Sequence, residues 1–234
     1  MNTIYDLLNE LYIIVKNIDD LKMKICSRHN LKYTCQDARL VALDSMNSDI
    51  LATSILINSY IDVFNSCCNN NKLDLEKFCS KIHCNKDYET IEDVTFNFLN
   101  ISLMTNVLFR IDNLLSNLLV AIEGKNTKNF YPKVERVFEL CLQNDRNEIN
   151  YKNSLIAFSL IRNSLHNNGI HKGKNEKFDI GDEIYEFIAN EKVTCASWAS
   201  IISLLDKSVI YLEHILLSNK LSKYDYIIDK FSNT

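Results

Sequence analysis

Apolar residues recur at steps of three and four along most of the chain, which is the spacing of one face of an α-helix. The clearest pattern lies between residues 101 and 122, where the two step lengths alternate without a miss. It predicts a long helix from near Thr90 to Gly124, because glycine commonly ends a helix. The seam consists of Ile101, Met104, Leu108, Ile111, Leu115, Leu118 and Ile122. Such a seam belongs to a buried core or, alternatively, extends into an interface between helix pairs.

The same periodicity predicts further helices on both sides of this segment. We expect them at residues 4–21, 48–64, 73–82, 133–142, 148–166 and 195–217. Pro132 suits the first turn of the 133–142 helix, because proline lacks the N–H that a first turn leaves unpaired. The 148–166 helix has apolar residues on nearly all sides, so we expect it at the centre of the fold. The segment from Ser27 to Asn47 shows no clear pattern.

One segment has the alternation of a β-hairpin rather than of a helix. Apolar and polar residues alternate weakly on both sides of Gly181-Asp182-Glu183, which predicts a small hairpin near residues 178–188. The chain has only four glycines and one proline, fewer than a fold rich in tight turns requires. We therefore predict an all-α fold, a bundle of long antiparallel helices with this one hairpin.

Length and composition indicate a globular protein of one or two units. We divide the 234 residues into a helical N-terminal extension (1–89), a helical domain (90–218) and a polar tail (219–234); one compact domain is the alternative. A net charge of −4 argues against a surface that coats nucleic acid broadly. Acidic residues interrupt the N-terminus, and the uncharged stretch at 94–109 is too short to cross a bilayer. We therefore expect a cytoplasmic protein without membrane contact.

The predicted 148–166 helix ends in a polar motif. Arg162 and His166 are four residues apart, so they share a helix face, and Asn163 follows the arginine. A guanidinium can hold a phosphate through two parallel hydrogen bonds, and an imidazole can transfer protons near neutral pH. These groups have the chemistry for metal-free RNA cleavage. The alternative is structural: Arg162 forms a buried ion pair with Asp112 or Glu148, and His166 caps the end of the helix.

The loop after the motif is basic. Between residues 162 and 177 there are one arginine and three lysines against Glu176 alone, a local balance of +3. Such a patch attracts phosphate even on an acidic protein. We expect its polar and basic side chains to bind substrate, namely Asn167, His171, Lys172 and Lys174.

The order of a long helix, a shorter helix and a helix ending in this motif resembles the HEPN superfamily of small all-α domains. The resemblance covers about residues 90–218 and rests on Arg162, Asn163, His166 and the following Asn167-Asn168-Gly169. It implies a metal-independent endoribonuclease of prokaryotic defence or toxin–antitoxin systems, with its site in a cleft between two protomers. By this resemblance, Arg162 contacts the scissile phosphate, Asn163 is the polar residue after it, and His166 transfers the proton.

The resemblance also implies the partners: a second copy of the chain, RNA, and an antitoxin or other protein. Three residues separate Arg162 from His166, fewer than the family usually has. Some members of the superfamily are non-catalytic, so a helical module that binds RNA, nucleotide or a protein partner is the alternative function.

The remaining chemistry of the sequence lies in its cysteines. Cysteine and histidine side chains gather between residues 67 and 84, and Cys79 and His83 have the spacing of one helix face. Zinc binding is the weaker interpretation, because the segment has no CxxC pair, and buried thiols are the stronger one. The members of this cluster are Cys67, Cys68, Cys79, His83 and Cys84. Without a glycine-rich phosphate loop or an HExxH motif, we predict neither a metal nor a cofactor.

Overall fold

The computed structural model describes residues 4–70, 88–142 and 149–230. Over these residues the protein is mostly α-helical, with six helices and one small antiparallel sheet of two strands. The elements are α1 (Ile4–His29), α2 (Ala38–Asn70), α4 (Tyr88–Glu123), α5 (Phe130–Leu142), α6 (Ile149–His166), β1 (Glu176–Ile180), β2 (Glu183–Phe187), α7 (Trp198–Leu216) and the short 3₁₀ helix η2 (Leu221–Lys223).

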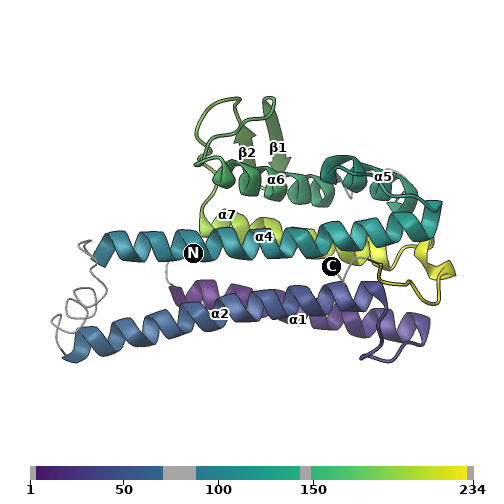
Figure 1. Ribbon diagram of the computed structural model, residues 1–234, viewed down its shortest axis with the longest axis horizontal. Coiled ribbons are helices and arrows are strands. Elements are labelled where there is room, and N and C mark those ends of the chain that lie inside the picture. The colour runs from purple at the N-terminus through teal and green to yellow at the C-terminus, as the bar shows by residue number, and fades with distance from the viewer. Residues whose placement is uncertain (1–3, 71–87, 143–148, 231–234) are drawn as a thin grey trace.

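The helices pack in three layers, as Figure 1 shows. The helices α1 and α2 pack against each other and form one layer, and α4 and α7 form the middle layer, packing on α2 and α1 respectively. The third layer contains α5, α6 and the hairpin, and α6 packs on both middle helices. The middle layer is therefore covered on both faces.

This position explains the composition of α4, in which two apolar stripes are buried. The central part of the predicted seam is buried, from Met104 to Leu118. A second set, which includes Leu103, Val107 and Leu114, is fully buried as well. A helix with apolar residues on two sides belongs between two layers, whereas a helix at the surface of a bundle needs only one stripe.

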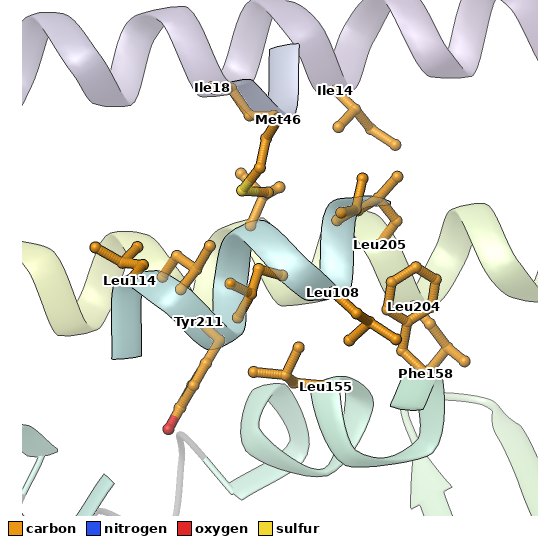
Figure 2. Packing of buried hydrophobic residues seen from close by; sticks show 14 of the residues in the cluster. Ile14, Ile18, Met46, Leu108, Leu114, Leu155, Phe158, Leu204, Leu205 and Tyr211 are labelled. Atoms are coloured by element: carbon orange, nitrogen blue, oxygen red, sulfur yellow. The ribbon is translucent and has the colours of Figure 1, made fainter. Parts of the chain in front are cut away.

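A single hydrophobic core joins the layers. In Figure 2, Ile14 and Ile18 of α1 and Met46 of α2 point toward α4 and α7. The same core continues on the other side of the middle layer through residues of α6, of which Leu155 and Phe158 have no exposed surface. The residues before and after position 90 thus contribute to one continuous core, and the division into an extension and a domain stays a prediction.

Several helix ends are where the sequence predicts them. At the end of α4, Gly124 has φ of 72°, and at the end of α6, Asn168 and Gly169 have φ of 56° and 80°. Glycine and asparagine tolerate this left-handed conformation, which stops a helix. At the start of α7, the Ser197 side chain accepts a hydrogen bond from the Ser200 N–H at 3.1 Å and caps the helix.

The predicted hairpin is present. Its strands pair from Glu176 opposite Phe187 to Ile180 opposite Glu183, two residues earlier than the predicted start, and Gly181 in the turn has φ of 64°. Alternate side chains face α6 and the core and are buried: Phe178, Ile180, Tyr185 and Phe187. The hairpin therefore covers one part of α6.

The second helix differs from its prediction. It begins at Ala38, ten residues before the predicted start at Ser48, and the patternless segment thus contains three of its turns. The cause is Asp37, whose carboxylate accepts the Arg39 N–H at 2.9 Å and caps the helix. The helix predicted at 73–82 lies outside the described residues.

Asp37 also belongs to a buried polar cluster that joins the α1–α2 connection to the 225–227 segment. Arg39 donates through Nε and Nη2 to the two carboxylate oxygens of Asp37, both at 2.8 Å, and its Nη1 lies 3.0 Å from His29 Nε2. The Ile227 N–H donates to Asp37 Oδ2 at 2.8 Å, and Arg39 also reaches the Asp225 carbonyl. We call Asp37, Arg39 and His29 the clamp, because they bind the 225–227 segment to the α1–α2 connection.

Two helical segments are long and apolar enough to cross a membrane, by length and composition only. They are residues 38–62 and 93–123, and 44% and 39% of their most apolar windows are buried inside the protein. Core helices of water-soluble proteins have this composition too. The absence of membrane contact stays a prediction.

Candidate functional site

The three predicted catalytic residues lie in the last turns of α6. Arg162 is half-buried, and Asn163 and His166 are exposed. Among the preceding residues of the helix, Phe158 and Ile161 have no exposed surface and hold it against the core. The motif is therefore where a rigid, buried helix reaches the surface.

Arg162 and Asn163 line a cavity of about 320 Å³ between α4, α6 and the start of α5. The α4 side consists of Leu108, Phe109 and Asp112. The third side is the segment Lys128, Asn129 and Phe130, at the N-terminus of α5. This volume is within the range of pockets that hold small molecules.

The guanidinium of Arg162 is only partly used inside the protein. Its Nη1 donates to the Asn163 side-chain oxygen at 2.9 Å, and its buried Nε has no hydrogen-bond partner. Among the side chains that the structure describes, no carboxylate forms an ion pair with it. A buried donor without a partner costs about 1–3 kcal/mol, and the cavity is lined by an arginine whose charge no described carboxylate neutralises.

The structure contradicts the alternative in which Asp112 neutralises Arg162. The Asp112 carboxylate accepts a hydrogen bond from Lys133 Nζ at 2.7 Å, and Lys133 is only 3% exposed. A buried ammonium needs this partner more than a half-buried guanidinium does. The other partner considered, Glu148, lies outside the described residues.

His166 lies next to the cavity and does not line it. Its Nε2 is 3.3 Å from Thr105 Oγ1, one turn before Leu108 on α4. It does not cap the helix. The Asn167 side chain donates to the Asn163 carbonyl at 2.8 Å, and the Gly169 N–H donates to the Ser164 carbonyl at 2.9 Å. These two residues satisfy the carbonyls that the helix end leaves free.

Of the four predicted substrate-binding residues, one is buried and three are exposed. His171 is 3% exposed, its Nε2 lies 2.8 Å from the Lys174 carbonyl, and its ring packs on Phe187 with 5.4 Å between centroids. These contacts fix the loop to the hairpin. Lys172 and Lys174 are exposed and do not line the cavity. Asn167 is exposed, with its amide nitrogen used for the cap.

Sequence reasoning did not include five residues of α4 and the start of α5 at this place: Thr105, Phe109, Lys128, Asn129 and Phe130. They come from two segments that are distant from the motif along the chain. One signal is visible in the sequence, because the polar stretch from Lys125 to Asn129 contains two lysines and directly precedes the helix that carries Pro132. Phe109 has no such signal, since an aromatic residue in an apolar helix is usually core.

No metal centre is found among the described side chains, where no group of three or more histidine, cysteine, aspartate or glutamate residues could hold an ion. The cysteine–histidine cluster from Cys67 to Cys84 lies outside the side chains that the structure describes. Described thiols are partly or fully buried. Burial raises the pKa of Cys141 to about 11, as expected of a packing residue.

Comparisons of the chain with protein-family models, with curated proteins and with solved structures found no match.

Proposed function

We propose that this protein is a HEPN-like, metal-independent endoribonuclease of the defence or toxin–antitoxin type. It acts as a homodimer in the cytoplasm, and its further partner is an antitoxin or other protein. One observation carries the proposal: the guanidinium of Arg162 borders a cavity, has a buried Nε without a partner, and forms no ion pair with a carboxylate of the described residues. A phosphodiester supplies the oxygen atoms that such a group binds.

The chemistry needs one cation and one group that transfers protons. His166 is exposed, and its imidazole takes the proton of the ribose 2′-hydroxyl, while the leaving 5′-oxygen takes a proton from the imidazolium so formed or from water. The 2′-oxygen attacks phosphorus, the P–O5′ bond breaks, and a 2′,3′-cyclic phosphate is the product. Arg162 stabilises the charge that develops on the phosphoryl oxygens. Asn163 holds one arm of the guanidinium through its side-chain oxygen.

The test is cleavage of labelled, structured RNA by the full chain in EDTA, with Arg162→Ala and His166→Ala as variants. Each substitution should lower the cleavage rate about 100-fold or more, the usual contribution of a proton-transfer or charge-stabilising group. Arg136→Ala is the matched control, because Arg136 is an exposed arginine of α5 that binds Glu123 and Glu139. Equal cleavage by all four proteins would exclude this site.

The homodimer is tested separately, by sedimentation of the purified chain and by the dependence of cleavage on protein concentration. Cleavage per chain should fall when dilution dissociates the dimer. A monomeric chain that cleaves at the same rate per molecule contradicts this part of the proposal.

The second candidate is a non-catalytic module that binds RNA or nucleotide. It is favoured by His166, which contacts Thr105 and does not line the cavity with Arg162. This function predicts RNA binding that Arg162→Ala weakens, without product formation and without any effect of His166→Ala.

A further inference from the structure

The cavity beside Arg162 is bordered by α4, α6 and the start of α5. Thr105 and His166 lie at one end of the α4–α6 contact, and Leu108, Phe109 and Asp112 follow along α4 toward Lys128 and α5. A phosphate bound by Arg162 would lie at this cavity, which Arg162 lines and His166 does not. Whatever is attached to that phosphate on the cavity side enters a space of about 320 Å³.

The walls of this space contain two aromatic rings. Phe109 is 52% exposed although it belongs to a central helix, and Phe130, at the start of α5, is half-buried. Stacking on aromatic side chains is the common way in which proteins bind the bases of single-stranded nucleic acids. The amide of Asn129 and the carboxylate of Asp112 add polar groups that can contact the edge of a base.

The charge at this place favours an anion despite Asp112. Two cationic side chains, Arg162 and Lys128, and one carboxylate, Asp112, line the cavity, and Asp112 already pairs with Lys133. The first N–H groups of a helix have no partner within the helix and carry a partial positive charge, and here α5 begins at the cavity. The cavity thus combines cationic side chains, Arg162 and Lys128, with two aromatic side chains, Phe109 and Phe130.

We propose that this cavity is a mononucleotide subsite, in which Arg162 contacts the phosphate and Phe109 and Phe130 hold the base. This subsite rests on the proposed function, because it assumes that RNA is the substrate. The subsite selects an unpaired nucleotide next to the scissile phosphate, because a base within a duplex cannot enter a cavity.

The test is isothermal titration calorimetry, in which the full chain is titrated with 3′-AMP, 3′-UMP, adenosine or orthophosphate. Each nucleotide should bind more tightly than the nucleoside or orthophosphate alone. Phe109→Ala should weaken nucleotide binding about tenfold, since base stacking contributes about 1–3 kcal/mol per base. Phe109→Tyr should retain the affinity. Phe98→Ala is the matched control, because Phe98 is a more exposed phenylalanine of the same helix that does not line the cavity.

The subsite would be overturned by the absence of nucleotide binding to the wild type, or by equal affinities of Phe109→Ala and Phe98→Ala. Tighter binding of orthophosphate than of nucleotide would also overturn it, leaving an anion site only. RNA cleavage measured on the same proteins separates this inference from the proposed function. Nucleotide binding that depends on Phe109 without RNA cleavage keeps the subsite and rejects the ribonuclease. RNA cleavage that depends on Arg162 and His166, together with unchanged nucleotide binding by Phe109→Ala, keeps the ribonuclease and rejects the subsite.

Discussion

Replacing Asp37 with asparagine should destabilise the protein strongly. Asp37 and Arg39 are both 0% exposed, and two hydrogen bonds of 2.8 Å join their charged groups. An asparagine has one oxygen instead of two and places an amide NH₂ against Arg39 Nη2 or the Ile227 N–H, both of which are donors. The variant therefore leaves a buried guanidinium without its counter-charge and brings donors together.

The expected cost is about 3–5 kcal/mol, the usual effect of removing one partner of a buried ion pair. A typical domain has a free energy of unfolding of about 5–15 kcal/mol, so this one substitution removes a large share. Most of the cost is the uncompensated charge rather than the lost attraction. The double variant Asp37→Asn/Arg39→Met, which removes the charge as well, should therefore be more stable than Asp37→Asn alone.

Urea denaturation measures this, with the fluorescence of Trp198, the single tryptophan, and far-ultraviolet circular dichroism as two signals. Glu139→Gln is the control, because it removes a carboxylate from the exposed pair with Arg136 and should leave the urea midpoint unchanged. The reasoning is refuted if Asp37→Asn costs less than about 1 kcal/mol. It is also refuted if the double variant is no more stable than the single one.

Two further predictions concern the clamp and the core. Burial, followed by the charge of Arg39, lowers the pKa of His29 below its ordinary value of 6.5, so the folded state favours the neutral ring. The unfolded chain then binds the proton more readily, and stability should be full above about pH 6.5 and fall as the pH drops from there through the lowered pKa. Urea midpoints between about pH 8 and pH 5 test this, and His29→Gln should flatten the slope; an unchanged slope contradicts the prediction. Leu115→Ala, at a position with no exposed surface, should cost about 2–5 kcal/mol in the same assay, whereas Leu51→Ala, at a 43% exposed position of α2, should cost far less. Equal costs would contradict the buried position of the seam.

The periodicity of apolar residues was sufficient to predict those helices and strands that the local sequence determines. The seam from Ile101 to Ile122 predicted α4 to within two residues at its start, and Asn168 and Gly169 predicted the end of α6. The hairpin followed from its alternation and from Gly181. In each case the signal is a side-chain pattern or a backbone conformation that the residues themselves determine, so no knowledge of distant contacts was needed.

The start of α2 could not be predicted in this way, because long-range contacts define it. Asp37 caps the helix while it binds Arg39 and the backbone of Ile227, which is 190 residues away. The sequence shows an aspartate before a helical segment. It does not show that the Ile227 N–H, in the C-terminal segment, donates to the second carboxylate oxygen of this aspartate. The same limit holds for the cavity, whose walls come from α4, α6 and the start of α5.

The two arginines that interrupt apolar surroundings differ in how far the fold uses their guanidinium groups. Each guanidinium nitrogen of Arg39 has a partner: Asp37 binds Nε and Nη2, and His29 binds Nη1. Such an arginine has no capacity left for a ligand. Arg162 has one side-chain partner, the neutral Asn163, a buried Nε without any, and a cavity in front of it. Arg162 therefore keeps an unneutralised charge and unused donors beside the cavity, and this supports the proposal that it contacts a phosphate oxygen.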